Sequence, residues 1–139
     1  MSEHYVIVGL QLAGSILLIL GLGHTAFYRI FGWKDDLAKI SSHNAILFMT
    51  LHIGTTILLF AFGVFTIYFS SQLSQANEGA AAICLALSVF WGWRLVWQIA
   101  YFTPPQKERS TMRLVAHCAL IAMFGMLIVA YAAPLVARA

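Results

Sequence analysis

The stretch Ser88–Phe102 reads SVFWGWRLVWQIAYF and forms the second part of an apolar run that begins at Ala80. At about 1.5 Å per helical residue, this run is long enough to cross a hydrocarbon core of about 30 Å. It nevertheless contains Arg94, whose guanidinium keeps its charge and costs about 2.5–3.5 kcal/mol at the centre of a membrane helix. The sequence therefore predicts a membrane helix in which some other interaction offsets the cost of one buried cation.

The chain as a whole is too apolar for a water-soluble protein. Of its 139 residues, 61% are hydrophobic and only 9% are charged, and the mean hydropathy is +0.85. A soluble domain needs about 25% charged residues to cover its surface. The basic residues lie in loops beside the apolar runs, which is typical of membrane orientation rather than of nucleic-acid binding. We therefore expect a lipid bilayer around the protein and no nucleic-acid partner.

Four apolar runs have the length of a membrane helix. We place them at about residues 5–28, 44–69, 79–102 and 112–133. They predict an all-α, integral membrane four-helix bundle with short loops, in which residues 1–139 form a single membrane domain. Pro134 is expected to end the last run, because proline cannot continue the hydrogen-bond ladder of a helix. The polar residues 70–77 are expected to form a turn.

The segment 29–42 after the first run has an amphipathic pattern. Trp33, Leu37 and Ile40 share one helical side, and the charged residues lie largely on the other. This pattern predicts either a short helix in the membrane interface or an ordered loop.

The basic residues are distributed unequally between the two sides of the predicted bundle. The loops after the first and third runs contain Arg29, Lys34, Lys39, Lys107, Arg109 and Arg113. The opposite side has only Arg138. Because loops rich in Lys and Arg stay in the cytoplasm, we expect a multi-pass protein of the plasma (inner) membrane with both termini outside.

The most polar side chains of the four runs fall in the half next to the basic loops. They are His24, His52, Arg94, Gln98 and His117. The other half is almost entirely Leu, Ile, Ala, Val and Phe. A bilayer disfavours such polar groups unless they meet one another or line a wet cavity. We therefore predict that they converge on one pocket in the cytoplasmic half.

The chemistry of this pocket depends on what pairs with Arg94. No Asp or Glu lies within the four runs, and an anionic headgroup, a carboxylate or a haem propionate would satisfy a guanidinium well. As ligand-binding residues we predict Arg94, Gln98, His52 and Tyr101. As ligands of a metal or a b-type haem we predict His24, His52 and His117, which nearby positive charge should keep neutral.

Three classes of function follow. The first is a small membrane protein whose pocket binds a haem, a metal, a quinone or an anionic lipid-like ligand. The second is a non-catalytic accessory or assembly subunit, in contact with other membrane subunits or with copies of itself. In that case Arg94 extends to the headgroups, and each histidine bonds helix to helix. A small anion transporter is less favoured, because the outer half offers no polar path. The sequence does not decide whether the protein is an enzyme.

The two cysteines carry a separate expectation. Cys84 lies near the outer end of the third run, and Cys118 lies near the inner end of the fourth. The helical rise separates them by roughly 12–15 Å, whereas a disulfide needs Cα atoms within about 7 Å. We expect two free thiols.

Overall fold

The computed structural model describes residues 2–102 and 111–138, and this part of the chain consists of helices without strands. The helices are α1 (Glu3–Ile30), α2 (Trp33–Leu37), α3 (Ser42–Tyr68), α4 (Ser70–Ser74), α5 (Glu78–Tyr101) and α6 (Thr111–Arg138). Within the described residues, the four long helices α1, α3, α5 and α6 are each long and apolar enough to cross a membrane. The predicted all-α bundle of four apolar helices is therefore confirmed.

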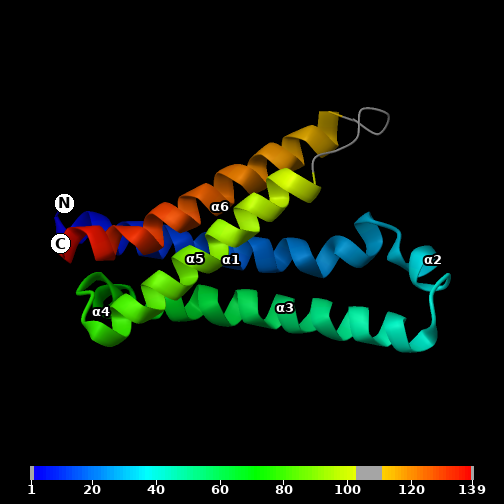
Figure 1. Ribbon diagram of the computed structural model, residues 1–139, viewed down its shortest axis with the longest axis horizontal. Coiled ribbons are helices and arrows are strands. Elements are labelled where there is room, and N and C mark those ends of the chain that lie inside the picture. Colours follow the sequence, from blue (N-terminus) through cyan, green and yellow to red (C-terminus); the bar gives the residue numbers. More distant parts are fainter. Residues whose placement is uncertain (1, 103–110, 139) are drawn as a thin grey trace.

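The four long helices form two antiparallel hairpins (Figure 1). The first hairpin pairs α1 with α3, and the second pairs α5 with α6. Both ends of the described chain and α4 lie at one end of the molecule, which we call the terminal end. The opposite end carries α2 and the start of α6, and we call it the loop end. The hairpins lie against each other at the terminal end and separate toward the loop end (Figure 1).

The helix boundaries follow local capping chemistry. Ser41 caps α3 by accepting a hydrogen bond from the Asn44 amide at 3.3 Å, and Asn77 caps α5 by accepting from the Ala80 amide at 3.0 Å. Such caps satisfy amides that have no partner inside the helix. Gly32, with a φ of 63°, directly precedes α2. The segment after α1 therefore forms a short helix, which was one of the two forms predicted for it.

Two boundary predictions were wrong. The last span does not end at Pro134, because α6 continues through it to Arg138. Proline removes one hydrogen bond to the carbonyl four residues earlier, but its fully buried ring gains packing, and membrane helices tolerate such an interior proline. The segment 70–77 contains the short helix α4 rather than a turn alone. The third run was placed at about 79–102, and residues 103–110, which follow it, lie outside the described residues.

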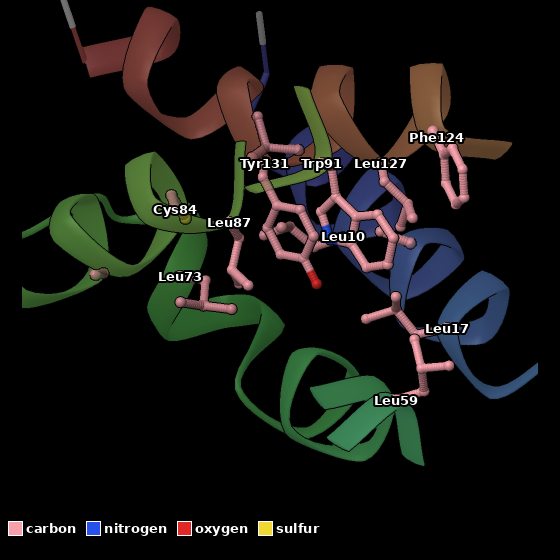
Figure 2. Packing of buried hydrophobic residues seen from close by; sticks show 13 residues of the cluster. Leu10, Leu17, Leu59, Leu73, Cys84, Leu87, Trp91, Phe124, Leu127 and Tyr131 are labelled. Atoms are coloured by element: carbon pink, nitrogen blue, oxygen red, sulfur yellow. The ribbon is translucent and has the colours of Figure 1, made fainter. Parts of the chain in front are cut away.

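The apolar core runs from the terminal end to the middle of the bundle (Figure 2). Helix α1 is its central element, since it contacts α3, α4 and α6. The buried apolar residues are Val6, Leu10, Ala13, Leu17, Leu59, Leu73, Ala80, Cys84, Leu87, Trp91, Phe124, Leu127 and Tyr131. One hydrogen bond crosses this core between the hairpins: the hydroxyl groups of Thr66 and Tyr131 are 2.6 Å apart, and both residues are 0% exposed.

Helices α1 and α3 touch through two glycines. A methyl group on Gly14 would lie 2.5 Å from Cγ1 of Ile67 and 2.7 Å from the carbonyl oxygen of Gly63. A methyl group on Gly63 would lie 2.7 Å from Cδ2 of Leu18 and 3.0 Å from the carbonyl oxygen of Gly14. Small residues allow this close backbone approach, which supplies van der Waals contact where lipid provides no hydrophobic driving force.

We predict that Gly63→Ala lowers the unfolding free energy by about 1–3 kcal/mol, as overpacking does in cores. The added methyl would meet a backbone oxygen that cannot move alone. Gly54→Ala is the matched control on α3, because nothing lies within 4 Å of its Cβ position, and it should leave stability unchanged or raise it slightly. Denaturant titration of the purified protein in bicelles measures both. Equal effects of the two substitutions would contradict the close approach.

Candidate functional site

Arg94 on α5 lies among aromatic rings rather than acids. Its guanidinium carbon is 5.2 Å from the ring centroid of Phe124 on α6, 5.9 Å from that of Trp93 and 6.0 Å from that of Phe102. Phe124 is 3% exposed and stacks on Trp91 at 5.4 Å between centroids. Phe102 follows the last turn of α5, so the half-buried arginine spans from the core toward the loop end.

The described residues give the Arg94 guanidinium neither a carboxylate nor a hydrogen-bond acceptor. The ion pair in this part of the chain joins Lys39 and Asp36 on the exposed surface of the α2 region. Cation–π contacts contribute about 0.5–2 kcal/mol each but leave the five N–H donors of the guanidinium unused. The arginine is therefore placed to take an external acceptor.

His24 and His52 meet within the first hairpin. Their rings stack at 5.3 Å between centroids with an interplanar angle of 13°, and Nε2 of His52 is 3.1 Å from the carbonyl oxygen of His24. A carbonyl oxygen can only accept, so Nε2 of His52 carries a proton and donates it. Nδ1 of His24 is buried and has no hydrogen-bond partner among the described residues.

Aromatic side chains hold this histidine pair in place at the loop end. The Phe27 ring lies 4.5 Å from the His24 ring, and the Trp33 ring of α2 lies edge-on to His52 at 4.7 Å. Trp33 also contacts Phe48 at 4.7 Å. Helix α2 therefore folds back over α3, and its tryptophan fixes the orientation of His52.

Gln98 and His117 meet within the second hairpin. Nε2 of Gln98 is 3.1 Å from Nδ1 of His117, and Gln98 is 4% exposed. Because an amide nitrogen can only donate, Nδ1 of His117 is the acceptor, and the neutral ring carries its proton on Nε2. This bond links α5 to α6 one helical turn beyond Arg94.

The predicted site residues thus fall into two groups, one within each hairpin. Arg94 lies close enough to His24 for their electrostatic interaction to cross between the hairpins. Tyr101 does not join either group: it is 68% exposed and stacks on Trp97 at 4.2 Å. The convergence of the remaining residues on one shared ligand stays a prediction.

The predicted metal ligands are divided between the hairpins, with His24 and His52 in the first and His117 in the second. Within the described residues, no three side chains of the His, Cys, Asp and Glu types lie close enough together to hold one. A haem or metal held by His24, His52 and His117 therefore remains a sequence prediction. Both cysteines are free, with Cys84 buried and Cys118 exposed.

The sequence reasoning missed polar contacts at the terminal end. Besides the bond between Thr66 and Tyr131, Gln11 donates to Ser70 at 3.5 Å and Ser74 donates to Glu3 at 3.4 Å. The terminal half of the bundle is therefore not purely apolar. The available signal was the recurrence of hydroxyl residues every four positions at 66, 70 and 74, which places them on one helical face.

A shallow groove of about 230 Å³ lies on the first hairpin beside His52. Its lining residues are Thr25, Tyr28, Met49, His52, Ile53, Thr56 and Ile57. The hydroxyl groups of Thr25 and Thr56 donate to carbonyls of their own helices, so the lining offers few free polar groups.

Comparison with protein-family models, with curated proteins and with solved structures finds no match for this chain. The function must therefore be argued from the site itself.

We predict that Gln98 and His117 are energetically coupled. In a double-mutant cycle with Gln98→Leu and His117→Leu, the interaction free energy should be about 0.6–1.7 kcal/mol, the range of hydrogen bonds inside membrane bundles. The control cycle pairs Gln98→Leu with His52→Leu. Because His52 lies in the other hairpin, the changes in unfolding free energy of these two substitutions should be additive. Unfolding in bicelles measures all variants. Coupling of similar size in both cycles would contradict the separation into two groups.

Proposed function

We propose that the protein is a multi-pass membrane protein that binds an amphiphilic anion, a molecule with an acidic headgroup and an apolar body. Arg94 is the headgroup ligand. The observation that carries this proposal is the half-buried guanidinium, which has aromatic neighbours but no acid or hydrogen-bond partner among the described residues. Carboxylate and phosphate groups match the planar fork of arginine with two parallel hydrogen bonds.

The surroundings of Arg94 favour a lipid-like ligand over a small soluble ion. Large apolar side chains remain exposed on the same helix, among them Trp93 at 51% and Val96 at 64%. An apolar tail can lie along such a surface while the acidic group reaches the arginine. The segment from the last turn of α1 through α2 lies at the same loop end (Figure 1). It contains Arg29 and Lys34, and Lys39 follows it, and positive charge there attracts anionic lipids.

The orientation of the protein belongs to the same proposal. We place the loop end at the cytoplasmic face of the plasma (inner) membrane and both termini outside, on the strength of the unequal distribution of Lys and Arg. The proposed site then lies in the cytoplasmic half of the bilayer.

A second candidate is an accessory subunit of a larger membrane complex. This candidate is supported by the exposure of α3: in its most apolar stretch, no residue is buried within the described chain. A partner helix could cover that surface. This candidate needs no ligand at Arg94, so the binding experiment below separates the two.

We predict cytoplasmic loops and external termini. Reporter domains active only in the cytoplasm should be active when inserted after Lys39 and inactive when fused after Arg138. A reporter active only outside should give the opposite pattern. Activity of the cytoplasmic reporter at the C-terminus would contradict this orientation, and equal activity at both sites would indicate mixed insertion.

We predict that Arg94→Gln weakens binding of a short-chain phosphatidic acid by about 10- to 100-fold, since hydrogen bonds to charged groups contribute about 1.5–3 kcal/mol. Arg94→Lys keeps the charge but loses the fork and should be intermediate. Native mass spectrometry of the detergent-solubilised protein, titrated with the lipid, measures the dissociation constants. Decanoate as a second probe tests whether a carboxylate serves as well as a phosphate.

The matched control is Arg29→Gln, which removes one positive charge from the same end at an exposed position. It should change the affinity little. Equal losses in Arg29→Gln and Arg94→Gln would mean general charge attraction and would contradict a specific site. If inorganic phosphate binds as tightly as the lipid, the proposal that the ligand needs an apolar body is contradicted. If none of the probes binds, the accessory-subunit function is favoured.

A further inference from the structure

The polar contacts of the described residues differ between the two ends of the bundle. At the loop end, the bond from His52 to the His24 carbonyl and the bond between Gln98 and His117 each stay within one hairpin. At the terminal end, the bond between Thr66 and Tyr131 joins α3 to α6. These two bonds at the loop end therefore each stay within a hairpin, whereas the bond at the terminal end joins the two hairpins.

Apolar burial follows the same division. The buried residues of α1 extend from Val6 to Gly21 and do not continue through its last turns to Ile30, and those of α3 begin only at Leu59. Figure 1 shows the hairpins diverging over this part of the molecule. Each hairpin is a packed unit, whereas their mutual packing is confined to the terminal half.

The linker between the hairpins has the features of a pivot. Ala76 follows α4 with a φ of 46°, a left-handed conformation that residues other than glycine rarely adopt. It is 0% exposed, and Arg138 at the end of α6 donates to its carbonyl at 2.5 Å. A few residues at element ends absorb the backbone change when rigid parts rotate. Rotation about this linker would move the loop ends most.

One polar side chain on each hairpin lacks a hydrogen-bond partner among the described residues. Arg94 on the second hairpin has no acceptor, and His24 on the first has a buried Nδ1 without a partner among the described residues. Buried polar groups in proteins almost always have a partner. An anion between them would accept from both side chains at once and would contact both hairpins.

We propose that the acidic headgroup bound by Arg94 also accepts a hydrogen bond from His24, and that this binding draws the loop ends of the two hairpins together. The inference rests on the proposed function. A ligand that contacts both hairpins binds the closed arrangement better than the open one, and this difference in affinity is what shifts the equilibrium. The ligand enters sideways from the bilayer, where the hairpins diverge.

The distance between the loop ends tests this closure. One nitroxide label is placed on the native Cys118, which is exposed on α6, and a second on Thr50→Cys, an exposed position of α3. Labelling the folded protein leaves the buried Cys84 unmodified, which mass spectrometry checks. Pulsed electron paramagnetic resonance in phosphatidylcholine nanodiscs, with and without phosphatidic acid, should give a shorter and narrower distance distribution when phosphatidic acid is present.

Variants of His24 separate its role from that of Arg94. His24→Phe keeps a ring against His52 and Phe27 but removes the donor, and it should weaken phosphatidic acid binding about tenfold and abolish the distance change. His24→Asn restores a neutral donor at nearly the same position and should recover both. His43→Phe, at an exposed histidine at the start of α3, should change neither.

A label pair at the terminal end is the second control. Tyr68→Cys and Val136→Cys, both at exposed positions, should report the same distance with and without lipid when Cys118 is replaced by Ser. Wild-type binding without any change between Cys118 and Thr50→Cys would overturn the closure and leave the proposed function standing. Unchanged affinity in His24→Phe would overturn the role of His24. Absence of lipid binding in the wild type would overturn the proposed function itself.

Discussion

The backbone contact between Gly14 and Gly63 is the constraint on which the first hairpin depends. Antiparallel helices that touch at one point have a fixed register everywhere else. His24 lies ten residues beyond Gly14, and His52 lies eleven residues before Gly63, so both stand roughly 15 Å from the contact along the helix axes. That is why their rings meet. A bulkier residue at either glycine would shift or separate the helices and remove the stack.

The second hairpin has its own register contact, the stack of Trp91 on Phe124. Gln98 lies seven residues after Trp91, and His117 lies seven residues before Phe124, which places their side chains opposite each other. Arg94 falls between these two contacts in the sequence of α5, and its guanidinium carbon lies 5.2 Å from the centroid of the Phe124 ring. The arginine is therefore positioned by packing that does not depend on any acid. Each hairpin thus has a register contact of its own.

Hydropathy and periodicity predicted much of this architecture, because lipid imposes strong constraints on span length and on backbone hydrogen bonding. Gly63 and Thr66 on α3, and Phe124 and Tyr131 on α6, recur at helical spacing and are buried. The prediction that Pro134 ends the last helix was wrong, because the effect of a proline depends on its tertiary packing, which the local sequence does not reveal. The pairing of His24 with His52 rather than with His117 depends on helix order and register, and neither is visible in one sequence. Tyr101 was assigned to the site by helical spacing alone; it is exposed, and its ring lies tilted against the Trp97 ring at 4.2 Å between centroids.

The energetic balance at Arg94 connects the fold to the proposed function. Insertion of an arginine costs about 2.5–3.5 kcal/mol, and cation–π contacts of about 0.5–2 kcal/mol with Phe124, Trp93 and Phe102 offset much of that cost without using a single N–H donor. An internal carboxylate would have made a stable pair, but it would also have occupied the fork permanently. Aromatic neighbours instead leave the guanidinium charged, half-buried and free to bind. The hairpins diverge toward the loop end (Figure 1), so the proposed anion between Arg94 and His24 would make contacts with both of them that neither hairpin can make alone.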